Sequence, residues 1–97
     1  MLDASDITHF RVEDTLLFAA TAEGRHLIKG NLDGLEAELD PNRFFRCHRA
    51  VIVNLGRIKE IKQLFKGAYL IVLNDPQATP LPLSRRQAKL LRERFPW

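Results

Sequence analysis

The stretch Arg43–Leu55, RFFRCHRAVIVNL, combines two kinds of sequence. Phe44, Phe45 and the run Val51–Val53 are aromatic or β-branched, which is typical of buried strands. Between them lie the polar or ionisable residues Arg46–Arg49. Because an unpaired polar group in a core costs about 1–3 kcal/mol, we expect the charged side chains to point out of the fold. The stretch therefore predicts a basic loop on a β scaffold.

Length and composition indicate one ordinary globular domain, residues 1–97, with a modest core. No apolar run approaches the roughly 20 residues that span a bilayer, and the first ten residues lack the pattern of a secretory signal. The single cysteine, Cys47, cannot form an internal disulfide, which favours a reducing compartment. We therefore expect a soluble, cytoplasmic domain with no membrane partner.

Charge is distributed unevenly along the chain. Residues 1–42 carry three basic and nine acidic groups, a net charge of −6, whereas residues 43–97 carry twelve basic and three acidic groups, a net charge of +9. A solvated surface is the usual explanation of such a run. Here the basic groups coincide with the stretch Arg43–Leu55, and a local positive field concentrates polyanions. A nucleic-acid partner is therefore favoured.

The N-terminal half predicts a meander of short strands followed by one small helix. Alternation and turn residues indicate three strands, at Ile7–Val12, Thr15–Ala20 and Arg25–Lys29. Asn31 is a good N-cap, leucines recur at helical spacing, and Pro41 stops the pattern. We expect this helix between residues 31 and 40 to pack on the sheet.

The C-terminal half predicts a second set of strands. Asn54–Arg57 is a turn, and Ile58–Phe65 is expected to be a strand that uses Leu64 and Phe65 as apolar groups, although a helical period also fits. Lys66 and Gly67 indicate a hairpin into the strand Ala68–Leu73. The prolines of Thr79–Leu83 confine that extended segment to a sheet edge or to positions that donate no hydrogen bond.

A final helix is expected from about residue 85. Ser84 is its N-cap, Ala88, Leu91 and Phe95 share one face, and arginines follow the cap directly. A helix N-terminus is electropositive and presents unpaired N–H groups, so phosphate binding there is physically favoured. A simple cap with solvated arginines is the alternative. The fold class is therefore mostly β, with short antiparallel sheets and two helices.

Catalysis is disfavoured by the sequence. Cys47 and His48 are adjacent on a strand, so their side chains point to opposite faces and cannot act as a nucleophile–base pair. Cys47 is better explained as a small core hydrophobe. His9 and His26 have no companion at metal-ligand spacing and are expected to be surface or satisfied core residues. We expect no catalytic residue, no metal site and no cofactor.

Two sequence blocks resemble a known family. The first is Phe45–Leu55, FRCHRAVIVNL, followed by Ile58 and Ile61, and the second is Pro82–Arg86, PLSRR. Together they are similar to the signature of the LytTR DNA-binding domain, and the acidic segment Asn31–Leu39 matches the region just upstream. The resemblance covers essentially the whole chain. It implies a mostly β output domain of bacterial two-component response regulators, which binds promoter DNA through loops.

The resemblance also implies roles for individual residues. It assigns base reading in the major groove to Arg49 and Arg85, where an arginine can donate two parallel bonds to guanine. It assigns support or phosphate contact nearby to Arg46, His48 and Arg86, beside the cap Ser84. On electrostatic grounds we add four possible phosphate contacts: Arg43, Lys62, Lys66 and Lys89.

The sequence departs from the family pattern at two places. The first strand-to-strand loop is the acidic Glu13-Asp14, which would repel phosphate, so a third contact from that loop is in doubt. Ala50 stands where the family commonly has serine, which removes one hydrogen-bond donor. The 97 residues include no receiver or sensor domain, so the chain is either a standalone member or a piece of a longer regulator.

The sequence thus favours sequence-specific binding of double-stranded promoter DNA, with repeated half-sites and a homodimer on DNA as the expected arrangement. One alternative is a single-stranded or non-specific nucleic-acid binder, which would need exposed aromatic rings for stacking. Most aromatic residues here occupy expected core positions. The other alternative is a protein-interaction module that uses the acidic half.

Overall fold

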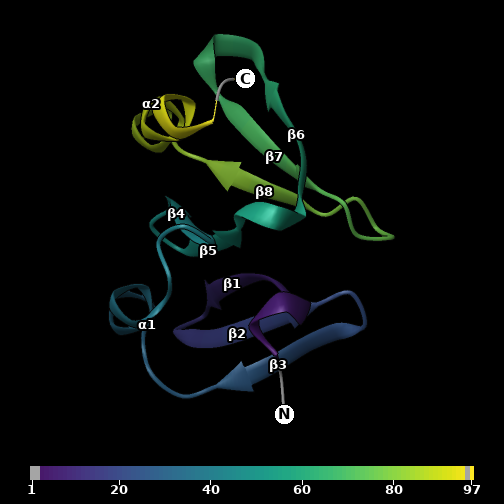
Figure 1. Ribbon diagram of the computed structural model, residues 1–97, viewed down its shortest axis with the longest axis vertical. Coiled ribbons are helices and arrows are strands. Elements are labelled where there is room, and N and C mark those ends of the chain that lie inside the picture. Colours follow the sequence, from purple (N-terminus) through teal and green to yellow (C-terminus); the bar gives the residue numbers. More distant parts are fainter. Residues whose placement is uncertain (1–2, 96) are drawn as a thin grey trace.

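The structure is a computed structural model and describes residues 3–95 and 97. These residues form two antiparallel sheets and two α-helices (Figure 1). The five-stranded sheet has the order β3-β2-β1-β5-β4 and the three-stranded sheet the order β6-β7-β8. The prediction of a mostly β fold with two helices is confirmed. The α-helices are α1 (Leu32–Glu38) and α2 (Arg85–Arg94), and the strands are β1 (Ile7–Glu13), β2 (Leu16–Thr21), β3 (Gly24–Ile28), β4 (Phe44–His48), β5 (Val51–Asn54), β6 (Ile58–Gln63), β7 (Tyr69–Leu73) and β8 (Pro80–Leu83).

The hairpin β4–β5 lies between the two halves of the molecule (Figure 1). Successive side chains of a strand point to opposite faces, and here both faces are covered. On one face Val51 and Val53 join a core with β7, β8 and α2. On the other face Ile52 joins a core with β1, β2 and α1. Burial on both faces explains why this stretch is a nearly continuous run of apolar residues rather than an alternating one.

The hairpin β4–β5 contains a β-bulge at Cys47. Arg46 pairs with Ile52 and His48 pairs with Val51, so β4 contributes one extra residue. The Cys47 side chain is fully buried, as the sequence predicts, whereas Arg49 in the turn is exposed. Bulges re-aim the side chains around them and are common beside functional sites.

Both helices begin at the residues that the sequence predicts. The Asn31 side chain accepts from the Gly34 N–H at 2.8 Å, and the Ser84 Oγ accepts from the Gln87 N–H at 3.2 Å. The proline-containing strand β8 lies at a sheet edge, also as expected. Within residues 3–95 no helix is long and apolar enough to cross a membrane.

The prediction for Leu64 and Phe65 is wrong. The pairing of β6 with β7 ends at Gln63 opposite Tyr69, so these two residues lie beyond the sheet. The side chains are 43% and 87% exposed. We call Leu64–Ala68 the β6–β7 tip. Phe95, expected on the buried face of α2, is also 43% exposed, because the helix ends at Arg94 just before it.

Candidate nucleic-acid interface

The fold brings the two family-like sequence blocks into contact. The Ser84 N–H donates to the Cys47 carbonyl at 3.0 Å, and the Gln87 side-chain amide donates to the Arg46 carbonyl at 2.5 Å. These bonds join the first turn of α2 to the end of β4. The turn that carries Arg49 and the helix start that carries Arg85 therefore belong to adjoining elements.

The Arg46 side chain holds the β4–β5 turn in place through hydrogen bonds inside the protein. Its side chain is only 17% exposed, and its Nη1 donates to the carboxylates of Asp33 at 3.0 Å and Glu36 at 2.9 Å. Its Nε and Nη2 donate to the carbonyls of His48 at 3.1 Å and Arg49 at 2.5 Å. With these donors engaged inside the protein, the geometry favours support by Arg46 over phosphate contact.

His48 holds the same turn from its other side. Its Nδ1 accepts from the Ala50 N–H at 3.1 Å, a role that requires the neutral ring. Burial lowers the pKa of His48, and the positive charges of Arg49, Arg11 and Arg46 lower it further. The neutral form is thus the one that the surroundings and the hydrogen bond both favour.

Arg49 lies at the tip of this fastened turn. It is exposed, and its guanidinium has no hydrogen-bond or ion-pair partner among the residues that the structure describes. Its backbone carbonyl, by contrast, accepts from Arg46. A fixed backbone with an unpaired guanidinium suits a residue that donates to an external acceptor.

Arg85 is positioned differently, because it reaches across to the β6–β7 tip. Its Nη2 donates to the Lys66 carbonyl, and its guanidinium lies beside Gly67. A Cβ atom at Gly67 would lie 3.4 Å from the Arg85 Nε. Gly67 also has a φ of +74°, a conformation that glycine adopts readily. The helix start and the tip thus form one basic surface.

The remaining predicted residues divide into two groups. Arg86 and Lys89 are exposed on α2, Lys62 is exposed on β6 at 4.0 Å from Glu60, and Lys66 is exposed on the tip. Arg43, however, precedes β4 and lines a shallow cavity with Ser5 and Arg57. The five residues of β4, at about 3.3 Å each, separate it from the β4–β5 turn. The structure does not bring Arg43 together with the others.

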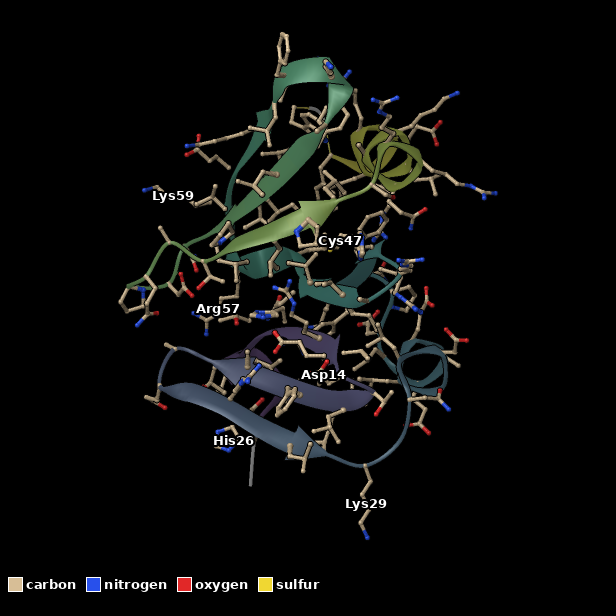
Figure 2. All side chains as sticks on the ribbon, turned by 180° about the vertical axis from the view of Figure 1, so that it is seen from behind. Asp14, His26, Lys29, Cys47, Arg57 and Lys59 are labelled. Carbon is tan, nitrogen blue, oxygen red and sulfur yellow. The ribbon has the colours of Figure 1, made fainter. Side chains whose placement is uncertain are left out.

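The acidic β1–β2 turn adjoins this surface. The Val12 N–H donates to the Ala50 carbonyl at 2.9 Å, so the end of β1 lies beside the β4–β5 turn. Glu13 pairs with Arg25 at 2.8 Å and with Arg11 at 3.5 Å. Asp14, labelled in Figure 2, is exposed and precedes Thr15. Its charge at this position would repel phosphate.

Two of the ionisable residues considered for chemistry, Cys47 and His9, are buried. Burial raises the pKa of the Cys47 thiol to about 12, and its Sγ contacts the Val51 carbonyl at 3.7 Å. His9 is buried, with its Nδ1 at 3.0 Å from the Thr8 hydroxyl, whereas His26 is exposed (Figure 2). Among the described residues no three His, Cys, Asp or Glu side chains are grouped to hold a metal ion.

Three features of this surface were not foreseen from sequence: the carboxylates that hold Arg46, the bond from Gln87 to β4, and the exposed ring of Phe65. One signal was available. Asp33 and Glu36 are three residues apart on a helix and so share a face, which made them candidates to hold one arginine. The Gln87 contact depends on tertiary placement and has no such signal.

Comparison with known proteins identifies the family. The family described as the LytTr DNA-binding domain matches residues 1–96. The chain belongs to the LytTR family. Its match to Escherichia coli K12 YpdB, a transcriptional regulatory protein, is 32% identical over 92% of this chain and 36% of the relative. Its match to Bacillus subtilis LytT, a sensory transduction protein, is 30% identical over 96% of this chain and 38% of the relative.

A further relative and a solved structure are also similar to this chain. RcoM 2 of Paraburkholderia xenovorans, named a heme-containing CO-sensing transcriptional regulator, is 31% identical over 96% of this chain and 34% of the relative. The chain thus spans about a third of the length of these relatives. A LytTr domain structure from Bacillus cereus covers 99% of this chain, and this chain covers 86% of it, with a TM-score of 0.88 and 24% identity. This likeness establishes the LytTR fold.

Proposed function

We propose that this domain binds double-stranded DNA sequence-specifically as the DNA-binding part of a bacterial transcriptional regulator. In this proposal Arg49 and Arg85 donate to base edges in the major groove. Arg46 and His48 hold the turn that presents Arg49, and no residue is catalytic. The names of the relatives, which include transcriptional regulators, agree with the assignment to a transcriptional regulator.

The observation that carries the proposal is the junction between the β4–β5 turn and α2. Hydrogen bonds from Ser84 and Gln87 to β4 hold two exposed arginines on adjoining elements. Arginine donates to guanine O6 and N7 in a bidentate geometry, and each such pair contributes about 1–3 kcal/mol of discrimination. Two such residues on one surface support readout of two nearby base pairs.

Phosphate contacts complete the proposed footprint. The N-terminus of α2 offers the electropositive end of a ten-residue helix, and the exposed basic side chains around it supply salt-dependent affinity. These are Arg86, Lys89, Lys62 and Lys66. Arg43, at the other end of β4 from the β4–β5 turn, lies outside this group of basic side chains. Repeated half-sites bound by a homodimer in the cytoplasm are part of the same proposal.

Binding-site selection from a random duplex library tests the proposal. The selection is performed with this domain at two salt concentrations, and bound duplexes are sequenced. We expect a short enriched motif, with affinity that falls as salt rises. Salt-sensitive binding without an enriched motif would leave only non-specific attraction and would overturn sequence-specific recognition.

A second candidate, single-stranded nucleic-acid binding, is favoured by one observation. The Phe65 ring is 87% exposed beside Lys66, and exposed aromatic rings serve as stacking platforms for unpaired bases. A competition experiment separates the two functions. Single strands that displaced the selected duplex at equal or lower concentration would favour this second candidate.

A further inference from the structure

The β6–β7 tip presents an aromatic side chain that the fold does not use. Phe65 is 87% exposed, more than the other exposed large hydrophobic residues among those that the structure describes. Removing the apolar surface of such a ring from water is favourable. Leaving it outside therefore forgoes stabilisation that a core position would provide. A partner that covered the ring would provide that stabilisation.

The tip is a hydrogen-bonded turn. The Leu64 N–H donates to the Ala68 carbonyl at 2.7 Å, which closes the loop. Lys66 has a φ of +62°, a left-handed conformation that is uncommon for residues other than glycine. The Arg85 guanidinium donates to the Lys66 carbonyl and holds this backbone in place. The neighbour of Phe65 in the tip is thereby bonded to the start of α2, and Figure 1 shows the β6–β7 hairpin that ends in this tip.

The charge around the tip selects the kind of partner. Glu60 is the one acidic residue between Leu55 and Asn74. The Lys66 ammonium lies 6.0 Å from the centroid of the Phe65 ring, and Arg85 adjoins the tip. An apolar protein surface would gain little from these cations, whereas a polyanion gains from each of them. The partner therefore combines negative charge with a small apolar group.

Duplex DNA offers this combination in its major groove. Thymine is the base that presents a methyl group there, and phenylalanine is among the side chains that recognise it. We propose that Phe65 contacts a thymine methyl group beside the base pair contacted by Arg85, and so determines specificity at that position. This inference rests on the proposed function, because it requires a specific duplex site.

Uracil substitution tests the contact directly. The duplex enriched by selection is resynthesised with one deoxyuridine at a time, which removes a single methyl group and leaves base pairing intact. Affinities are measured for the unsubstituted protein and for Phe65→Ser. We expect Phe65→Ser to weaken binding about fivefold to tenfold, as for partial burial of one aromatic side chain. At one thymine, replacement by deoxyuridine should weaken binding by the unsubstituted protein. The same replacement should leave the affinity of Phe65→Ser unchanged.

Salt dependence and a matched control separate this contact from a phosphate contact. Phe65→Ser should leave the slope of affinity against salt unchanged, whereas Lys66→Ala should reduce the slope by about one, since it removes one charge. Leu27→Ser removes a 63% exposed apolar side chain from β3 and should leave binding unaffected. Thermal melting of each variant verifies that it is folded.

Each other outcome overturns the inference. Unchanged binding by Phe65→Ser, or a loss that is the same for every thymine and deoxyuridine duplex, would exclude a methyl contact. A loss confined to duplexes with two sites would instead assign Phe65 to contact between two copies of the domain. Absence of any enriched motif would overturn the proposed function itself. An enriched motif without coupling to a methyl group would overturn this inference alone.

Discussion

The two sheets of this domain hold their basic loops in different ways. The larger sheet contains the buried polar residues Thr8, His9 and Asn54. Asn54 donates to the Ile7 carbonyl at 2.8 Å and accepts from the Gly56 N–H at 3.0 Å. The smaller sheet, among its described residues, buries only apolar side chains: Ile71, Val72, Leu73, Leu81 and Leu83.

The difference extends to the loops. The β4–β5 turn of the larger sheet is fastened by a half-buried network centred on Arg46, and its exposed Arg49 contributes no side-chain bond to it. The β6–β7 tip of the smaller sheet is joined to α2 by Arg85, an exposed residue that we also propose to contact DNA. In our proposal, support of the loop and recognition of DNA are thus divided between two residues in the β4–β5 turn and combined in Arg85 at the β6–β7 tip.

The largest effect is expected from removing the support of the β4–β5 turn. Arg46→Ala leaves two turn carbonyls and two carboxylates without their donor. Hydrogen bonds to a charged group contribute about 1.5–3 kcal/mol each, but Asp33 and Glu36 are 90% and 52% exposed and contribute less. We expect the free energy of unfolding to fall by about 2–3 kcal/mol, measured by urea titration.

Arg85→Ala is the matched control for that experiment. The hydrogen bond from Arg85 to the Lys66 carbonyl lies at the surface. We therefore expect the free energy of unfolding to fall by less than about 0.5 kcal/mol. Equal losses for the two variants would contradict the distinction between a fastened turn and an exposed tip. Circular dichroism of both variants verifies that the comparison concerns folded proteins.

Acid is expected to weaken the larger sheet through His9. Burial, with the positive charge of Arg11, lowers the pKa of His9 from 6.5 to about 4. The unfolded chain therefore binds more protons between these values. Stability from the neutral ring is fully present above pH 6.5 and declines as pH falls towards 4. We expect the free energy of unfolding to be about 2 kcal/mol lower at pH 5 than at pH 7.

Urea titrations at the two pH values measure this loss. His9→Asn removes the titrating ring and should show a smaller difference between the two pH values, even if it is less stable at both. His26→Asn, at an exposed position, should retain the full difference. A full difference in His9→Asn would assign the acid sensitivity to other groups.

The sequence predicted what depends on local chemistry. Asn31 and Ser84 each accept from an N–H group three residues away, so their roles follow from neighbouring residues alone. The burial of Cys47 follows from its place in an apolar strand. Phe65 was assigned to a strand because an apolar residue two positions before a glycine fits both a strand and a hairpin tip. Where strand pairing ends is decided by the partner strand.

The candidate interface shows the same limit of prediction from sequence. Arg49 and Arg85 were found through two sequence blocks, but the bonds that join those blocks depend on tertiary structure. Arg46 and Arg49 have the same side chain and lie in the same short run. Only the position of α1 beside β4 gives one of them carboxylate partners. Residue type and spacing therefore predict which arginines are candidates for DNA contact, but not which of them is held by hydrogen bonds inside the protein.

Loss of discrimination is the next effect in size. Arg49→Ala and Arg85→Ala should each reduce the ratio of specific to random duplex affinity by about tenfold, within the 1–3 kcal/mol that a bidentate pair contributes. Because Arg85 also holds the tip, Arg85→Ala and Phe65→Ser should be non-additive when combined. Arg49→Ala and Phe65→Ser should be additive. Titrations of fluorescent duplexes measure all five variants.

Additivity is the readout that sharpens the comparison. Equal coupling of Phe65 to both arginines would show that the turn and the tip act as one unit. An unchanged ratio for either single arginine variant would remove that arginine from base recognition.

The smallest effect is expected at the carboxylates that hold Arg46, and its sign is informative. Asp33→Asn with Glu36→Gln removes two negative charges near a surface proposed to meet phosphate. Reduced repulsion should raise affinity for random duplex. If these carboxylates also fix the β4–β5 turn, Arg49 becomes less well placed, and the ratio of specific to random affinity should fall by about threefold, or roughly 0.6 kcal/mol.

Glu38→Gln, on the same helix and exposed, is the control for charge alone. It should raise both affinities together and leave the ratio unchanged, because none of the hydrogen bonds to Arg46 involves Glu38. An unchanged ratio of specific to random affinity in the double variant would show that Asp33 and Glu36 only neutralise charge and do not orient Arg49. A reduced ratio combined with tighter random binding cannot arise from electrostatic attraction alone, since attraction to phosphates is the same for every sequence. It would identify α1, which packs beside the larger sheet, as the element that orients Arg49.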